Sequence, residues 1–247
     1  MIETVIEKSK ALSLSAVVQH LPETIDLSRQ KNWSTLQVID HLLELEMERR
    51  KNNRIEMRFK QSKLGERPTI DQFDFDYHPS RKGNRNKILS LMTQEFIENR
   101  QDIILIGNPG TGKTMLAKCF AYAATQAQVK VLFTTAMDMI NQLIAADADK
   151  SLLKKLHIYQ SPDLLVIDEL GYLPLGVQGS NLLFQVISAR HDKKSTAITT
   201  NLPFAAWGKI FDSTTVATAI ADRLVFNSEV LVLEGESYRK KTRKKMK

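Results

Sequence analysis

The sequence Gly107-Asn108-Pro109-Gly110-Thr111-Gly112-Lys113-Thr114 decides the fold of this chain of 247 residues. It matches the pattern G-x-x-x-x-G-K-[ST] at every fixed position. The apolar run 103–106 precedes it, and apolar residues follow at helical spacing, at positions 115, 116, 120 and 124. A strand, a glycine-rich turn and a helix in this order predict the phosphate-binding loop of an α/β nucleotide-binding domain.

The residue types of this loop suit the binding of ATP and Mg²⁺. Glycines let the backbone curl around phosphate oxygens and direct its N–H groups at them, and the following helix adds the positive end of its dipole. Lys113 is expected to reach the β- and γ-phosphates, and the hydroxyl of Thr114 to ligate Mg²⁺. The alternative is a glycine-rich turn that merely precedes a helix, and the full motif in this context argues against it.

Two carboxylates follow another apolar run, residues 164–167. Asp168 and Glu169 stand where this predicted strand ends. Parallel strands bring their carboxyl ends to one edge of the sheet, where the loop 107–114 also lies. Asp168 is therefore predicted to hold Mg²⁺, directly or through water, and Glu169 to polarise the attacking water. Taken without the loop, the same pair could simply cap a helix.

Three further polar residues are candidates for the same site. Asn201 can orient water if its strand neighbours the strand of the loop; otherwise it is a turn residue before Leu202-Pro203. Arg223 lies in the predicted helix before the last strand. There it either projects from one subunit onto the γ-phosphate of the next or forms a surface pair with Asp222. Arg239 either contacts ATP or begins a solvated tail.

Five short apolar runs, separated by helical stretches, predict the rest of the fold. Such runs, rich in β-branched residues and bounded by turn residues, are typical of a parallel sheet that helices cover on both faces. The fold class is therefore α/β, a P-loop NTPase with a parallel five-stranded sheet. The runs are residues 103–106, 131–135, 164–167, 196–199 and 230–233.

The chain is expected to divide into four parts. Helical periodicity and a capping box at residues 34–37 predict a small helical N-terminal domain. A segment punctuated by proline and glycine then reads as a linker that docks Phe73, Phe75 and Tyr77 on the next domain. The parts are the helical domain, 1–67; the linker, 68–88; the ATPase domain, 89–236; and a basic C-terminal tail, 237–247, in which residues 239–247 are expected to be mobile.

Composition places the chain among soluble globular proteins. Hydrophobic residues make up 43% and charged residues 26%, and no stretch approaches the roughly 18 consecutive apolar residues that a membrane helix needs. The first ten residues lack the apolar core of a secretory signal, so a cytoplasmic protein without a membrane partner is expected. The single cysteine, Cys119, excludes an internal disulfide, and the five histidines show no zinc-ligand spacing.

The net charge of +7 is consistent with a polyanionic partner such as nucleic acid, and the chain carries three basic clusters that could meet the phosphates of such a partner. Each basic cluster could equally be an ordinary solvated face. No helix-turn-helix stands out, so binding through the DNA backbone with modest sequence preference is expected. The candidate clusters are Arg49, Arg50, Arg54, Arg58 and Lys60; Arg81, Lys82, Arg85 and Lys87; and Lys150, Lys154 and Lys155.

The order of these features resembles the AAA+ branch of P-loop ATPases. Within it the chain resembles the IstB-like proteins, ATP-dependent helpers of bacterial transposition that are related to the DnaC-type helicase loaders. The loop alone is common to many ATPases, whereas the Asp-Glu-Leu-Gly-Tyr and Asp-Arg-Leu elements in this order are much more specific. The resemblance covers nearly the whole chain and rests on residues 49–75, 106–114, 167–172, 199–202, 222–224 and 235–239.

This resemblance implies a reduced AAA+ core that assembles with ATP into a spiral or ring-shaped homo-oligomer on duplex DNA and delivers that DNA to a partner transposase. It assigns Arg223 as the arginine that acts on the neighbouring subunit, and Arg239 as a second sensor. Fewer than about 15 residues follow the last predicted strand, so no large helical lid is expected at the C-terminal side.

The predicted function is therefore an ATP-dependent, DNA-binding helper of transposition. Its ATP hydrolysis is expected to be slow and stimulated by DNA, and to switch assembly and disassembly. A replicative helicase loader of the DnaC type would share the nucleotide site but grip a helicase. An assembly or scaffold protein would bind ATP and seldom hydrolyse it. A small-molecule kinase would need an acceptor pocket and a lid, and the sequence indicates neither.

Overall fold

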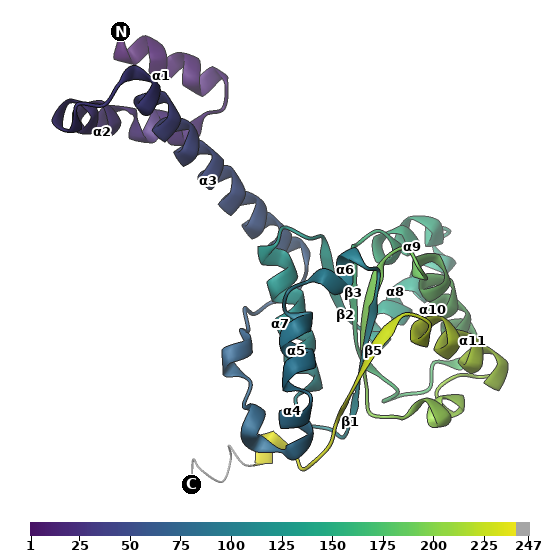
Figure 1. Cartoon of the computed structure of the whole chain (residues 1–247). Helices are drawn as coiled ribbons and strands as arrows, with labels where there is room; N and C mark the ends of the chain where they lie inside the picture. The colour runs from purple at the N-terminus through teal and green to yellow at the C-terminus, as the bar shows by residue number, and fades with distance from the viewer. Residues whose placement is uncertain (241–247) are drawn as a thin grey trace. The chain divides into compact units, whose positions relative to one another are not determined.

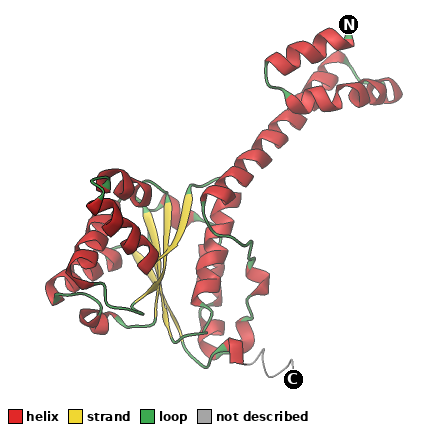
Figure 2. Cartoon of the chain, turned by 180° about the vertical axis from the view of Figure 1, so that it is seen from behind, coloured by secondary structure: helices red, strands yellow, loops and turns green. Residues whose placement is uncertain are grey.

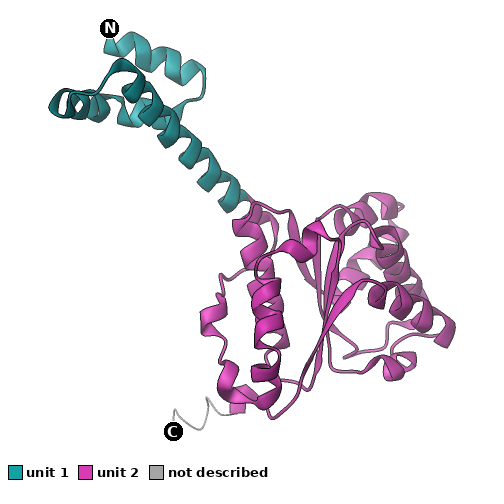
Figure 3. Ribbon diagram, viewed as in Figure 1, with its two compact units in different colours: residues 1–57 teal, residues 58–247 magenta. Residues whose placement is uncertain are grey.

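The computed structural model describes residues 1–240 and divides into two compact units, Met1–Met57 and Arg58–Lys247 (Figure 3). The division falls inside helix α3, Thr35–Gln61, before residue 67, where the sequence predicts the end of the N-terminal domain. Residues 241–247 of the predicted basic tail lie outside the described residues. Within residues 1–240, no helix has the length and apolar character needed to span a bilayer.

The first unit consists of helices α1, Ile2–Ala11, and α2, Ser15–Lys31, together with the first part of α3. The predicted capping box at the start of α3 is confirmed. Ser34 Oγ accepts a hydrogen bond from Gln37 N–H at 3.3 Å, and Gln37 Oε1 accepts one from Ser34 N–H at 2.8 Å. The two side chains thus satisfy N–H groups that the first turn of a helix leaves without partners.

The apolar periodicity that predicts α3 does not correspond to a buried face of the first unit. Leu42 is buried in the core, where it packs with Val17 and Leu21 of α2, and Val38 of α3 packs partly buried against the same cluster. The helix is present as predicted, but the first unit by itself leaves most of its apolar stripe uncovered. The exposed members of the stripe are Leu36, Ile39, Leu43 and Met47.

The second unit contains a five-stranded sheet in which every neighbouring pair of strands is parallel (Figure 1). The strand order is β2-β3-β4-β1-β5, so the predicted parallel five-stranded sheet is confirmed. Because all strands run in one direction, their carboxyl ends meet at one edge of the sheet. The strands are β1, Asp102–Gly107; β2, Val131–Thr135; β3, Leu164–Leu170; β4, Ser195–Thr200; and β5, Ser228–Leu233.

Helices cover both faces of this sheet (Figures 1 and 2). Successive side chains of a strand point to opposite faces, so Ile103 of β1 joins one core and Ile104 joins the other. The first core receives α5, Arg85–Leu91, and α7, Lys113–Gln126. The second core receives α8, Ala136–Ala148; α9, Leu152–Gln160; α10, Gly176–Arg190; and α11, Thr214–Val225. The shorter elements are η1, Ile70–Gln72; η2, Phe75–Tyr77; α4, Pro79–Gly83; α6, Glu95–Glu98; and η3, Phe204–Lys209.

Residues 68–88 pack on the first of these two cores. Phe73 is 5% exposed and lies in a cluster with buried residues of β1 and α7, and Phe75 packs against the same cluster. Arg81 belongs to this packed segment, because it is only 3% exposed. The prediction that Arg81 forms part of a DNA-facing cluster is therefore wrong, since a buried guanidinium cannot meet a DNA backbone. The other members of that cluster, Lys82, Arg85 and Lys87, are exposed.

Candidate functional site

The loop 107–114 connects β1 to α7 at the carboxyl edge of the sheet. Gly110 and Gly112 have φ angles of +82° and +102°, which favour glycine. A Cβ atom at Gly110 would lie 2.2 Å from Ser237 Oγ, and one at Gly112 would lie 2.7 Å from Phe73 Cε2. Glycine is therefore required at both positions for two reasons. The backbone conformation of the loop favours it, and the segments that pack on the loop leave no room for a side chain.

Lys113 lies buried against this loop, with 5% of the residue exposed. Its Nζ donates hydrogen bonds to the carbonyl oxygens of Gly107 at 2.7 Å and Asn108 at 2.9 Å. Burial lowers the pKa of the Lys113 ammonium, and the charge of Asp168 opposes that shift. An ammonium held by two neutral carbonyl oxygens can exchange them for the charged oxygens of a phosphate, which are stronger acceptors.

Asp168 is held by two hydroxyl groups. Its Oδ1 accepts a hydrogen bond from Thr114 Oγ1 at 3.0 Å and one from Thr199 Oγ1 at 2.5 Å. A carboxylate beside a hydroxyl offers the hard oxygen donors that Mg²⁺ prefers, and Mg²⁺ commonly completes its shell with water and substrate phosphates. Within residues 1–240 no group of three His, Cys, Asp or Glu side chains is placed to hold a metal. The carboxylate of Asp168 and the hydroxyl of Thr114, with phosphate oxygens and water to complete the shell, fit a Mg²⁺ ion that binds together with a nucleotide.

Thr199 is a site residue that the sequence analysis does not single out. Its Oγ1 donates to Asp168 and also accepts from the backbone N–H of Glu169 at 2.9 Å, so one hydroxyl orients both acidic residues. Glu169 has a φ angle of +63°, and its side chain is exposed. In the sequence, Thr199 is recognisable only as a threonine at the end of a predicted strand. Its role depends on β4 lying beside β3, and the order of strands in the sheet decides this.

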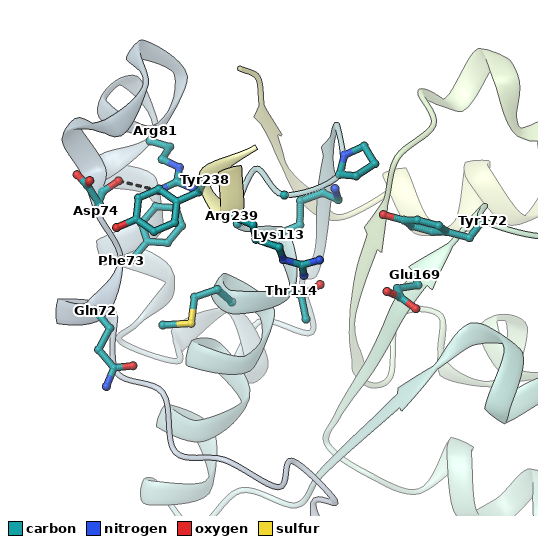
Figure 4. A pocket seen from close by; sticks show the side chains of 14 residues that line it. Gln72, Phe73, Asp74, Arg81, Lys113, Thr114, Glu169, Tyr172, Tyr238 and Arg239 are labelled. Carbon is teal, nitrogen blue, oxygen red and sulfur yellow. Dashed lines mark hydrogen bonds between the residues drawn. The ribbon is translucent and has the colours of Figure 1, made fainter. Parts of the chain in front are cut away.

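A cavity of about 410 Å³ opens beside Lys113 (Figure 4). Four segments that are far apart in the sequence line it: the linker, the loop 107–114, the carboxyl end of β3 and the turn after β5. In Figure 4, Glu169 and Tyr172 lie on one side, and the linker residues Gln72, Phe73 and Asp74 lie on the other. The side chains of Lys113, Thr114 and Arg239 lie between them. The cavity thus brings Lys113 and Thr114 together with Glu169, and Asp168 adjoins them through its hydrogen bond with Thr114.

Arg239 reaches this cavity from the turn that follows β5, in which residues 238–240 are helical. The turn is fixed to the loop, because the backbone N–H of Tyr238 donates to the carbonyl oxygen of Gly110 at 2.9 Å. The charge of Arg239 also contributes to the lowered pKa of Lys113. Of the two alternatives for Arg239, its place in the described chain favours a contact with bound nucleotide.

Asn201 does not line the cavity, although β4 neighbours β1 as its predicted role requires. Its Oδ1 is buried and has no hydrogen-bond partner within residues 1–240. A Cβ atom at Gly171 would lie 3.2 Å from this oxygen. A buried acceptor of this kind is a place where a water or a ligand donor is expected.

Arg223 also lies away from the cavity. Its Nη1 donates to the carbonyl oxygen of Ala219 on the same helix at 2.9 Å, and its guanidinium stacks 4.7 Å from the ring centroid of Phe184. The side chain borders a shallow surface hollow together with Thr214, Thr218 and other residues of α11. Arg223 therefore cannot be assigned to the nucleotide site of its own chain in this conformation.

The predicted DNA-binding residues differ in their surroundings. Arg49 and Arg50 pair with the buried carboxylate of Glu46 at 2.6 Å and 2.7 Å. Hydrogen bonding to Arg49 is the main reason that the pKa of Glu46 falls to about 2. Arg58 Nε donates to the carbonyl oxygen of Gln128 at 3.0 Å, and Lys155 Nζ donates to Gln142 Oε1 at 3.2 Å. The exposed members are Arg50, Arg54, Lys60, Lys150 and Lys154.

Comparison with known sequences finds one family that spans almost the whole chain. The model of the family described as IstB-like ATP binding protein matches residues 7–246. The chain is 37% identical to the IS5376 insertion-sequence ATP-binding protein of Geobacillus stearothermophilus, over 97% of this chain and 94% of that protein. It is 34% identical to the corresponding IS232 protein of Bacillus thuringiensis subsp. berliner, over 92% of this chain and 90% of that protein.

Comparison with solved structures finds the same kind of core. The DnaC helicase loader aligns with a TM-score of 0.58 at 22% identity, over 67% of this chain and 96% of that chain. AMPPCP-bound DnaA from Aquifex aeolicus aligns with a TM-score of 0.58 at 19% identity, over 74% of this chain and 56% of that chain. At these identities the likeness concerns the fold of the second unit's core alone.

Proposed function

The chain belongs to the IstB-like ATP-binding protein family, and on that premise we propose that it is an ATP-dependent helper of transposition that assembles on duplex DNA. The observation that carries the proposal is the convergence of Lys113, Thr114, Glu169 and Arg239 on one cavity. Relatives of this chain are named as ATP-binding proteins of insertion sequences, which supports a role in transposition.

The cavity would bind ATP with its β- and γ-phosphates against the loop 107–114. Lys113 would exchange the carbonyl oxygens of Gly107 and Asn108 for phosphate oxygens. Thr114 and Asp168 would hold Mg²⁺, which when bound neutralises negative charge on the phosphates. The chain's own contribution is a set of donors arranged before the nucleotide arrives, so little reorganisation is needed on binding.

Hydrolysis would be assisted by the acidic end of β3. Glu169 would polarise the attacking water, because its carboxylate lines the cavity while its backbone is held by Thr199. Asn201, with its buried and unsatisfied Oδ1, would help to orient that water. Arg239 would contact the phosphates from the turn after β5 and would report their presence to that turn.

Arg223 would complete the nucleotide site of a neighbouring subunit. It lies on α11, away from the cavity of its own chain, which supports a role in trans. A positive charge that reaches the γ-phosphate from a second subunit couples the nucleotide state to the contact between subunits. ATP would therefore favour a spiral or ring-shaped homo-oligomer, and hydrolysis would loosen it.

Duplex DNA is proposed as the surface on which this oligomer forms. Exposed basic residues, among them Lys150 and Lys154 around the start of α9, can pair with phosphates without reading bases. The assembled protein would hold and bend the DNA and deliver it to a partner transposase. Hydrolysis would then act as a switch for release, so turnover is expected to be slow and to rise with DNA.

Phosphate release, measured with and without duplex DNA, tests the proposal. The expected result is slow hydrolysis that DNA stimulates, together with spirals or rings in electron micrographs of the mixture. Lys113→Ala should abolish nucleotide binding. Lys118→Ala is the matched control, because Lys118 lies on the same helix but pairs with Glu66. A purified wild-type protein that gives no heat on titration with Mg-ATP would sink the proposal.

A replicative helicase loader is the second candidate, since the fold aligns with the DnaC helicase loader. That likeness concerns the ATPase core, and a loader would differ in what its N-terminal unit binds. Affinity capture with the full chain and ATP, using a purified transposase and a purified helicase in parallel, separates the two. Retention of the helicase alone would favour a loader. ATP binding without DNA-stimulated hydrolysis would favour a scaffold.

A further inference from the structure

We propose that Arg81 is a positioning residue of the phosphate-binding loop, which holds the Thr111–Gly112 peptide unit so that its N–H group faces the phosphates. The inference rests on the proposed nucleotide site. It concerns a residue of the linker, thirty positions before Thr111, that the sequence suggested as a DNA contact.

Two N–H groups of the Arg81 guanidinium converge on one backbone oxygen. Nε donates to the carbonyl oxygen of Thr111 at 3.2 Å, and Nη2 donates to the same oxygen at 2.8 Å. A peptide unit is planar and trans, so its C=O and N–H groups point in opposite directions. Fixing the Thr111 carbonyl toward the linker therefore turns the Gly112 N–H away from the linker, to the side where α7 begins.

That side of the loop is where the phosphates would lie. Gly112 is the N-cap of α7, and the first N–H groups of a helix point out of its N-terminal end without intrahelical partners. The Gly112 N–H can join these N–H groups in binding phosphate only while the Thr111–Gly112 peptide plane keeps the orientation that directs it toward the phosphates. Glycine has little preference of its own for such an orientation, so the restraint must come from a contact. Arg81 supplies that contact.

An aromatic cage holds the guanidinium in place. The carbon Cζ of Arg81 lies 4.4 Å from the ring centroid of Phe73, 4.9 Å from that of Tyr77 and 5.1 Å from that of Tyr238. Nη1 donates to the carbonyl oxygen of Asp74 at 2.9 Å. Burial lowers the pKa of Arg81, but a guanidinium remains charged at neutral pH. Rings on its faces and carbonyl oxygens at its edge replace the water that burial removes.

The cage also ties the turn that carries Arg239 to the same peptide region. The backbone N–H of Tyr238 donates to the carbonyl oxygen of Gly110, one residue before the carbonyl that Arg81 holds. The rings of Tyr77 and Tyr238 meet edge to face at 4.9 Å. Two successive carbonyl groups of the loop are thus held from outside, one by the linker and one by the turn after β5.

Lysine cannot replace arginine in this position. Its ammonium is a compact point charge that cannot place two N–H groups on one carbonyl while a flat face stacks on aromatic rings. The charge-assisted hydrogen bonds at stake predict a loss of Mg-ATP affinity of about 10- to 100-fold in Arg81→Met, with Arg81→Lys between it and the wild type.

Isotope labelling can observe the proposed peptide unit directly, because the dipeptide Thr-Gly occurs once in the chain, at Thr111-Gly112. Protein labelled with ¹³C at the threonine carbonyl and ¹⁵N at glycine gives a single carbonyl–amide correlation. In Arg81→Met the Thr111 carbonyl resonance should move in the nucleotide-free protein, and the Gly112 amide should respond less to Mg-ATP. Arg85→Met is the matched control, because Arg85 stacks on Phe75 at 5.3 Å in the same segment and is exposed.

The outcomes separate this inference from the nucleotide site itself. A folded Arg81→Met protein with the wild-type correlation and wild-type affinity overturns the inference and leaves the site intact. If Arg81→Met does not fold, Arg81→Lys replaces it in both measurements. A wild-type Thr111 carbonyl resonance together with wild-type affinity for Mg-ATP in Arg81→Lys would then overturn the inference. If the wild-type protein does not bind Mg-ATP, the proposed nucleotide site is wrong. Comparing the Thr111 carbonyl resonance of the nucleotide-free wild type with that of Arg81→Met still tests whether Arg81 orients the loop.

Discussion

Thr199 Oγ1 donates a hydrogen bond of 2.5 Å to Asp168 Oδ1, the same oxygen that accepts from Thr114. The bond joins the carboxyl ends of two neighbouring strands, β3 and β4. With Oδ1 occupied by two hydroxyl groups, the orientation of the carboxylate is set before any metal binds. A residue that orients a metal ligand in this way commonly affects metal affinity nearly as much as the ligand does.

Thr199→Val should therefore weaken binding of Mg-ATP by roughly 10- to 100-fold, because valine has the same shape but cannot hold Asp168. Titration calorimetry with and without Mg²⁺ measures the effect, which should be confined to the magnesium-dependent part. Thr125→Val is the control, since Thr125 is equally buried but its hydroxyl bonds to the Tyr122 carbonyl oxygen within α7. Equal losses in both variants would mean that Thr199 acts only through packing.

Glu169→Gln should bind Mg-ATP like the wild type and hydrolyse it at least about 100-fold more slowly, because the amide keeps the shape but cannot accept a proton. Binding is measured by calorimetry and hydrolysis by phosphate release in the presence of duplex DNA. Glu229→Gln, which alters an ion pair with Lys87, should leave both unchanged. Normal hydrolysis by Glu169→Gln would show that another group activates the water.

Arg223→Ala should be nearly inactive alone, with hydrolysis reduced by about 1000-fold as expected for an arginine that acts on the γ-phosphate. Lys113→Ala should be inactive because it binds no nucleotide. Mixing the two variants should restore part of the activity, because an Arg223→Ala subunit can bind ATP and receive Arg223 from a Lys113→Ala neighbour. A mixture as inactive as its components would contradict the role in trans.

Asp102 should make folding depend on pH. Burial raises its pKa to about 7 in the folded chain, from 3.8 as the ordinary value, although the N–H of Thr196 donates to it at 2.6 Å. The folded state thus keeps a proton that the unfolded state releases. The contribution of this proton to the free energy of unfolding is fully present below pH ~4 and is lost as the pH rises through ~7.

Asp102→Asn removes this titration and keeps the acceptor for Thr196. Relative to this variant, the wild type should lose on the order of 4 kcal/mol of unfolding free energy between pH 4 and 7. Urea unfolding, followed by the fluorescence of Trp207 in a Trp33→Phe background, measures the difference in the second unit. Parallel stability curves for the two proteins over this pH range would contradict the prediction.

Much of the fold could be predicted because its signals are local. Each of the five apolar runs corresponds to a strand, and the loop 107–114 lies between β1 and α7 as the motif requires. A strand needs a short run of apolar, β-branched residues, and a phosphate loop needs glycines at fixed spacing. Both are properties of a few consecutive residues.

The candidate site could be predicted only in part. Lys113, Thr114, Asp168 and Glu169 follow from motifs at strand ends, and the structure brings them together. Thr199 could not be ranked above its neighbours, because its role depends on which strand lies beside β3. The exposed stripe of α3 likewise reads as a buried face in sequence, since periodicity reports the helix and not what covers it.

By itself, the sequence determined that this chain has a phosphate-binding loop, an acidic strand end and a parallel sheet, because each depends on the chemistry of adjacent residues. Only the tertiary structure decided that Arg81 is buried against Thr111 and that Arg239 shares a cavity with Lys113. These contacts join segments between thirty and more than a hundred positions apart. A charged side chain looks the same in sequence whether packing takes it into the core or leaves it in water, so its role is set by what folds around it.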